Sequence, residues 1–309
     1  MNTKRTGWAF LWMTVGFMAA SLFTSFFTPD IGIAQTALIS ELCLLIPAAY
    51  YLGKGRTKLA SQLRLRLIKP TTALMVLVYH LCCYPVIIAM NAFSLAVSDN
   101  AAMDIQMEFA GESYFAIWFF VGLIGPVVEE FVFRGAILSG LRTTGRIFSA
   151  IVLSALLFGL VHMNVNQLSY TFFAGIYWGL LAEATGSIIP SVICHVIMNS
   201  FSVIAMYFYD RNLSGMEGIL GQAETESTAA YIGTGCVFLV IAVFTTMLAM
   251  LMLRVISLNE GFTGCVWNIF RKKTKAERYG SLFSVPLVVG MVFSVIIIIW
   301  LMVIDFIRW

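Results

Sequence analysis

The sequence predicts an all-α, polytopic transmembrane helix bundle of about eight to nine spans. Hydrophobic residues make up 60% of the chain, charged residues only 11%, and the mean hydropathy is +0.90. A soluble domain carries about 25% charged residues. Most of the apolar runs reach the ~20 residues that a helix needs to cross ~30 Å of hydrocarbon. The runs are 7–27, 34–52, 71–96, 113–139, 147–163, 167–182, 187–209, 230–253 and 282–304, of which 147–163 and 167–182 are short.

Basic residues fall in segments that nine alternating spans would place on one side. They gather at the N-terminus and in loops 53–69 and 254–280, whereas segments 97–112 and 210–229 are acidic. Cytoplasmic loops carry an excess of Lys and Arg, so we predict a bacterial plasma-membrane protein with a cytoplasmic N-terminus. The first run is too long for a signal peptide, and we expect it to be retained. The net charge of +3 reflects these loops and does not indicate a nucleic-acid partner.

Few polar side chains lie within the apolar runs, and such residues are functional candidates by default. All three histidines of the chain are among them. The six cysteines show no CxxC spacing and predict neither a disulfide framework nor a zinc framework. The intramembrane candidates are Glu41, His80, Glu129, Glu130, Arg134, His162, His195 and Asn199.

Depth arguments bring four of these residues together. Counted from the basic ends of their helices at ~1.5 Å per residue, Glu129 lies ~18 Å deep and His162 ~22 Å deep. On the same count His195 lies at ~12 Å and Asn199 at ~18 Å, and their i,i+4 spacing places them on one helix face. Three helices therefore direct a carboxylate, two imidazoles and an amide to a similar depth, which favours a shared hydrated cavity.

The other candidates have structural interpretations. Glu130 and Arg134 share a helix face about 100° away from Glu129, so they are expected to pair and leave Glu129 free. His80 precedes Pro85 and is expected to be a bundle-facing donor near a kink. Glu41 is expected to be protonated or paired with a neighbouring helix, because an isolated charge is costly there.

Three classes of intramembrane hydrolase are disfavoured because their motifs are missing. No histidine begins the HExxH motif of zinc metalloproteases, and no GxSG motif of a serine hydrolase is present. An aspartyl protease needs two aspartates within spans, but all five aspartates lie outside the apolar runs or at the far C-terminus. Cys194 directly precedes His195 and so points elsewhere on the helix. A carboxylate and an imidazole that activate water remain: Glu129 as general base with His162 orienting the water, and His195 with Asn199 as oxyanion donors.

At these residues the chain resembles the CPBP family of CAAX-protease and bacteriocin-processing intramembrane proteases. Its three motifs correspond to "EEFVFR" from Glu129, "FGLVH" from Phe158 to His162 and "HVIMN" from His195 to Asn199. The resemblance extends from Pro126 to Ser200 and implies an intramembrane endopeptidase in which Glu130, Arg134 and Phe158 support the site. The family is often classed with metalloproteases. We expect no required cofactor; if Zn²⁺ is bound, Glu129, His162 and His195 would be its ligands.

We therefore treat residues 1–309 as one integral membrane domain with three parts. These are N-terminal spans in 1–112, catalytic core spans in 113–209 and accessory spans in 210–309. The expected partners are a peptide or protein substrate at the membrane and the lipid bilayer; the oligomeric state is not defined. Two alternatives stay open: a non-catalytic immunity or scaffold protein that binds a peptide in the same cavity, and a proton-coupled transporter.

Overall fold

The computed structural model describes residues 2–27, 31–54, 59–98, 112–212, 227–271 and 273–308. Within these ranges the chain is helical and contains no strand. Several charges used to predict the topology lie outside the described residues, namely Arg56, Lys58, Asp99, Asp104, Glu108, Glu217, Glu224, Glu226 and Lys272.

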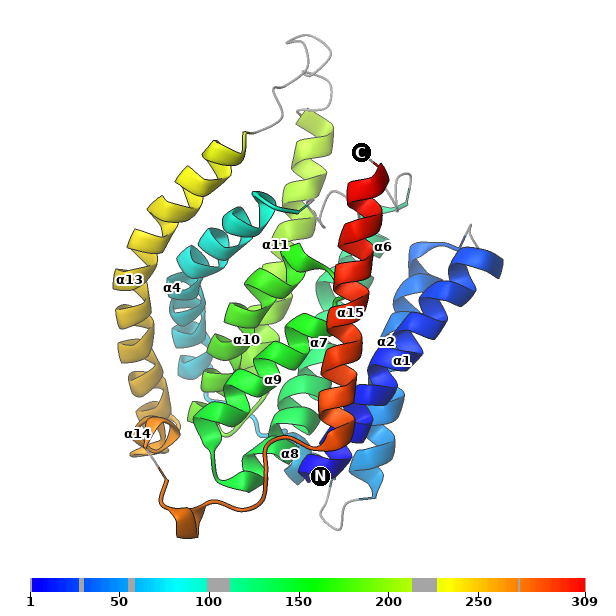
Figure 1. Ribbon diagram of the computed structural model, residues 1–309. Coiled ribbons are helices and arrows are strands. Elements are labelled where there is room, and N and C mark those ends of the chain that lie inside the picture. The colour runs from blue at the N-terminus through cyan, green and yellow to red at the C-terminus, as the bar shows by residue number, and fades with distance from the viewer. Residues whose placement is uncertain are drawn as a thin grey trace.

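The helices run side by side as one bundle (Figure 1). Helices α1, α2 and α15 pack together, α4 packs along α13, and α9 and α10 lie between these groups with α7 and α11. The N- and C-terminal ends lie at opposite ends of the bundle. The long helices are α1 (Thr3–Phe27), α2 (Ile33–Gly53), α4 (Pro70–Leu95), α9 (Ile147–Val161), α10 (Val165–Thr185), α11 (Ile189–Asn212), α13 (Thr228–Asn259) and α15 (Val285–Arg308).

One further span is a continuous but irregular helix from Tyr114 to Thr144. It consists of α6 (Tyr114–Ile117), the π-helix η1 (Trp118–Ile124), α7 (Gly125–Glu130), the π-helix η2 (Phe131–Ile137), α8 (Leu138–Leu141) and the 3-10 turn η3 (Arg142–Thr144). Short helices α3 (Leu59–Leu63), α14 (Cys265–Phe270) and η4 (Lys275–Glu277) lie at the end of the bundle that carries the basic loops 53–69 and 254–280, called the basic end.

The predicted membrane class is confirmed. Among the described residues, seven helices are long and apolar enough to cross a bilayer. The remaining two predicted runs are also helical. Helix α9 has only 15 residues, or ~22 Å at ~1.5 Å per residue, and α10 has 21 residues with polar side chains near both ends. The predicted eight to nine spans are reached when these two helices in the middle of the bundle are counted.

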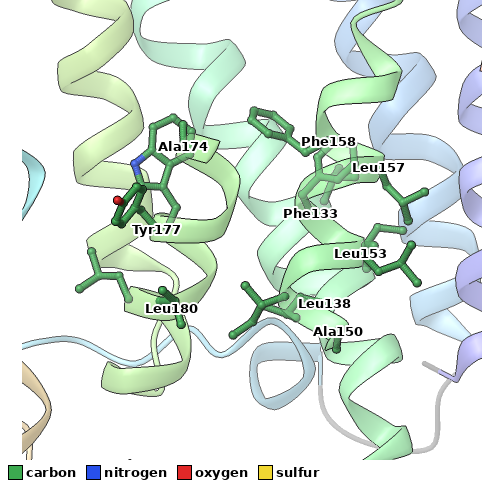
Figure 2. Close-up of a cluster of buried hydrophobic side chains, with 14 of the residues drawn as sticks. Phe133, Leu138, Ala150, Leu153, Leu157, Phe158, Ala174, Tyr177 and Leu180 are labelled. Atoms are coloured by element: carbon green, nitrogen blue, oxygen red, sulfur yellow. The ribbon is translucent and has the colours of Figure 1, made fainter. Parts of the chain in front are cut away.

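The core is packed where α9 and α10 meet the irregular span. Figure 2 shows buried members of this core: Phe133 and Leu138 from that span, Leu153, Leu157 and Phe158 from α9, and Ala174, Tyr177 and Leu180 from α10. Lipid is as apolar as these side chains, so close van der Waals packing holds such helices together.

Two glycines allow the close contact of α9 and α10, as the Gly-x-x-x-Gly spacing suggests. A Cβ added at Gly175 would lie 2.9 Å from Cβ and 3.0 Å from Cα of Ala155. A Cβ added at Gly179 would lie 2.8 Å from Cγ2 of Ile151. Because the Ala155 backbone cannot move aside cheaply, Gly175 fixes the distance between the two helices.

The basic end of the bundle is tied down by ion pairs. Buried Glu183 at the end of α10 pairs with Arg64 and with Arg142, the latter at 3.3 Å. Buried Glu260 accepts a hydrogen bond from Thr72 Oγ1 (2.5 Å) and pairs with Arg66 (2.5 Å). Burial alone would raise the pKa of Glu260, but these bonds and one from the Lys69 amide outweigh it and lower the pKa below its ordinary value. Three of the basic residues that predict the topology, Arg64, Arg66 and Arg142, therefore also anchor the ends of α4, α10 and α13.

We expect Gly175→Ala to destabilise the protein by ~1–3 kcal/mol, because its methyl group would overpack against the Ala155 backbone. Gly233 on α13 is the matched control, since a Cβ there meets no heavy atom within 4 Å. Gly233→Ala should leave stability unchanged or raise it, because Ala is the better helix former. Thermal unfolding in detergent measures both variants. Equal melting temperatures for Gly175→Ala and Gly233→Ala would contradict the proposed close contact.

Candidate active site

The structure brings Glu129, His162 and His195 together from three helices. Nε2 of His195 lies 3.4 Å from Oε2 of Glu129, and Nε2 of His162 lies 3.9 Å from Oε1 of the same carboxylate. Glu129 is the second-last residue of α7, His162 caps the C-terminus of α9, and His195 lies on α11. The side chains of Glu129 and His162 are 17% and 15% exposed, so the cluster is not fully buried on the side of these two residues.

Glu130 points away from Glu129 and is fully buried. Its Oε1 lies 2.8 Å from Nη1 of Arg134, one turn along, and 3.1 Å from Nδ1 of His195. The predicted pairing of Glu130 with Arg134 is therefore present, with a third member that the sequence did not indicate. Truncating one partner of a buried pair leaves an uncompensated charge and costs ~3–5 kcal/mol. Glu130 thus holds α11 in register with the irregular span.

The hydrogen-bond partners of the imidazoles determine which ring nitrogen faces Glu129. Nδ1 of His162 lies 2.7 Å from the Phe158 carbonyl, which can only accept. Nδ1 of His195 faces the Glu130 carboxylate, which also accepts while it is paired with Arg134. Both Nδ1 atoms must therefore carry hydrogen, and each ring turns its Nε2 towards Glu129.

Aromatic rings fix the plane of His195. The Trp178 ring stacks on it at a centroid distance of 4.3 Å and 29°, and Phe158 meets it edge-on at 5.6 Å. The Arg134 guanidinium lies 4.5 Å from the Phe158 ring and 5.3 Å from the Trp178 ring. Phe158 was expected to support the site and is placed to do so. Trp178 was missed, because an aromatic residue in an apolar helix gives no polar signal in the sequence.

Asn199 lies one turn beyond His195 and does not bond to Glu129. Its Nδ2 donates to the Val121 carbonyl at 3.1 Å, and the neighbouring Ser200 hydroxyl donates to the Gly122 carbonyl at 3.4 Å. Both carbonyls lie in η1, one turn before Pro126. Proline has no N–H to donate to that turn, so side chains of α11 supply hydrogen bonds that the backbone cannot. The amide expected in an oxyanion site therefore also bridges two helices.

Helix α9 ends at the site through a left-handed residue. Met163, directly after His162, has φ 51°, a conformation usually taken by glycine at this position. Holding a non-glycine residue there costs on the order of 1–3 kcal/mol, and such residues cluster at functional sites. The early end of α9 leaves His162 as the cap, with its ring turned towards Glu129.

The two remaining polar candidates also lie near the cluster. His80 is 2% exposed and packs edge-on against Tyr84, and neither ring nitrogen has a hydrogen-bond partner among the described residues. The predicted donor role of His80 is therefore not seen. Glu41 on α2 has a buried Oε2 that likewise lacks a hydrogen-bond partner within the described ranges, and its second oxygen faces Gly125 on α7.

The donor types at Glu129, His162 and His195 match those of catalytic zinc sites with two histidines and a glutamate. Their grouping does not: among the described residues, no three His, Cys, Asp or Glu side chains are arranged to hold a metal ion. No chemical step below is therefore routed through a metal.

The fold and the site together define a class: a polytopic integral membrane protein in which helices assemble a carboxylate and two imidazoles inside the bundle. Comparison with known proteins finds a family resemblance for part of the chain. Residues 111–201 match the family model of type II CAAX prenyl endopeptidase Rce1-like proteins. The resemblance predicted from the motifs is confirmed over this segment.

Two curated relatives each match a part of the chain. The chain is 28% identical over 117 residues to the putative membrane peptidase YdiL of Bacillus subtilis (strain 168). This match covers 38% of this chain and 44% of that protein. It is 34% identical over 92 residues to the membrane-embedded CAAX protease MroQ of Staphylococcus aureus (strain USA300), which covers 28% of this chain and 37% of that protein. The chain thus spans less than half the length of these curated relatives. No solved structure matches it.

We expect Asn199→Ala to lower stability by ~1–3 kcal/mol, because it leaves the partly buried Val121 carbonyl without its donor. Pro126→Ala restores a backbone N–H at this turn. The double variant should therefore recover part of the loss seen in Asn199→Ala. Thermal unfolding of the two single variants and the double variant measures the coupling. Strictly additive changes would show that Asn199 does not replace the missing proline donor.

Proposed function

We propose that the protein is an intramembrane endopeptidase that hydrolyses a peptide bond of a membrane-associated peptide or protein precursor. One observation carries the proposal: the Glu129 carboxylate lies within 4 Å of two imidazole Nε2 atoms whose opposite nitrogens are anchored. The family match supports a membrane protease of the Rce1-like type.

In the proposed reaction Glu129 is the general base and His162 orients the water. A water molecule that contacts both side chains gives one hydrogen to Glu129 while its oxygen attacks the carbonyl carbon of the peptide bond. The lone pair at Nε2 of His162 accepts the second hydrogen and fixes the direction of attack. The proton taken by Glu129 then passes to the leaving amine nitrogen as the C–N bond breaks, which returns Glu129 to its charged form.

His195 and Asn199 are proposed to stabilise the oxyanion of the tetrahedral intermediate. For this role Nε2 of His195 needs a hydrogen, so the ring acts in its doubly protonated form, donating from Nδ1 to Glu130 and from Nε2 to the oxyanion. One Nδ2 hydrogen of Asn199 is used by Val121, which leaves the second for the oxyanion. Trp178 and Phe158 hold the His195 ring in the plane that this geometry needs.

The role of Glu129 is tested by comparing membrane proteins in cells that express wild type, Glu129→Gln or the control Glu277→Gln. Glu277 lies at the basic end and pairs with Arg271, away from the site. We expect the N-terminal peptides to reveal at least one precursor that is cleaved in the wild type and the control. Loss of a general base slows its cleavage in Glu129→Gln by at least ~100-fold.

A Glu129→Gln profile identical to the wild type would contradict the peptidase proposal. If that variant also kept the cellular phenotype, the result would favour the scaffold interpretation. Proton-coupled uptake that is lost in Glu129→Gln, without any uncleaved precursor, would favour transport.

We further propose that hydrolysis needs no metal ion. Purified protein dialysed against 1,10-phenanthroline is expected to cleave the precursor found above within ~2-fold of its original rate, whereas a zinc hydrolase loses activity with its metal. A parallel sample dialysed without chelator is the control. Inactivation by the chelator that added Zn²⁺ reverses would overturn this proposal and assign Glu129, His162 and His195 as ligands.

A further inference from the structure

We propose that Glu41 is a positioning residue for Glu129: a neutral carboxylic acid on α2 that donates a hydrogen bond to the Glu129 carboxylate. The proposal rests on the peptidase function proposed above and adds a fourth helix to the site. Neither the motifs nor the matched segment, residues 111–201, include Glu41.

The contact of Glu41 with α7 places its carboxyl group on the Glu129 face. A Cβ added at Gly125 would lie only 3.1 Å from Oε1 of Glu41. Gly125 is the first residue of α7, and Glu129 follows four residues later in the same α-helix. Residues four apart on an α-helix are neighbours on one face, with Cβ atoms ~5–6 Å apart. Absence of a side chain at Gly125 thus leaves the space that the Glu41 carboxyl group occupies next to Glu129.

The surrounding charges favour one proton on this pair of carboxyl groups. Gly125 brings Glu41 and Glu129 to one face of α7. Arg134, four residues after Glu130, pairs with that carboxylate. Among the described residues no Lys or Arg forms an ion pair with Glu41. A buried carboxyl group that lies beside another carboxylate and has no cation of its own keeps its proton, because both groups cannot ionise at close range.

The proton belongs on Glu41 if Glu129 is to be the base. Glu129 is approached by two imidazoles and is partly exposed, whereas Oε2 of Glu41 is buried with no hydrogen-bond partner among the described residues. A neutral Glu41 can donate to Glu129 and so hold its carboxylate in the orientation that faces the water. No proton leaves Glu41 in this role, so the proton balance of the hydrolysis stays as described above.

Three variants separate positioning from a structural role. Glu41→Leu removes the donor at similar volume, and Glu41→Gln keeps a donor of similar shape. Cys43→Ala is the matched control on the same helix, since its sulfur faces Gly16 of α1 instead of α7. The rate is measured on the precursor that accumulates in Glu129→Gln cells, and stability by thermal unfolding.

We expect Glu41→Leu to lower kcat by ~10–100-fold with KM within ~3-fold, because a misplaced base slows the chemical step more than binding. Glu41→Gln should recover kcat to within ~3-fold of wild type, and Cys43→Ala should match wild type. The melting temperature of Glu41→Leu should not fall, since the variant removes a poorly paired buried carboxyl group. A wild-type kcat in Glu41→Leu, a Glu41→Gln variant as slow as Glu41→Leu, or a drop in melting temperature would each overturn the proposal.

Infrared spectroscopy tests the same idea without any substrate. The carbonyl stretch of a protonated carboxyl group is expected in the wild type and should be absent in both Glu41→Leu and Glu41→Gln. Its frequency should shift in Glu129→Gln, because the acceptor of the hydrogen bond changes. An unchanged band in Glu41→Leu overturns the proposal for Glu41. Absence of any cleavage by the wild type, with the band behaving as expected, would instead count against the peptidase function alone.

Discussion

The buried charge of Glu130 is the constraint on which the rest of the site depends. A carboxylate with no solvent exposure in an apolar bundle is tolerated only with compensation close by, and here Arg134 and His195 provide it from two helices. That requirement sets the register of α11 against the irregular span. It also determines the neighbours of Glu130: His195 must turn its Nε2 towards Glu129, which precedes Glu130 in the chain and points ~100° away from it around the helix. The reactive surface of the cluster is thus a consequence of how one charge is neutralised.

The site is built where helices depart from regularity. Two π-helical segments flank α7, a proline removes a backbone donor, and a left-handed Met163 stops α9 early. Each departure frees or redirects a polar group at a depth where lipid offers no partner. Side chains from α11 meet the freed carbonyls, so the irregularities are compensated locally and the bundle stays closed around the polar cluster. Such bulges are frequent at functional sites.

The sequence was sufficient for the helices and for the convergence of Glu129, His162 and His195, because both follow from run length and from the rise and rotation of a helix. The different directions of the Glu129 and Glu130 side chains also follow from the ~100° step between adjacent residues of a helix. Other features depend on contacts between distant segments. Nothing local indicates that Glu183 meets Arg64, that Trp178 lies flat on His195, or that Asn199 binds Val121. The π-helices were also not predicted, since their hydrophobic pattern reads as ordinary helix over 113–139.

The shortness of α9 has a consequence for the way to the reactive cluster. At 15 residues it falls ~8 Å short of a typical hydrocarbon thickness, so its capped end at His162 lies within the bilayer depth. Most side chains of α9 are buried against neighbouring helices, so protein and not lipid surrounds that end. A polypeptide that reaches the carboxylate must therefore come in among the helices, past the partly exposed side of Glu129 and His162.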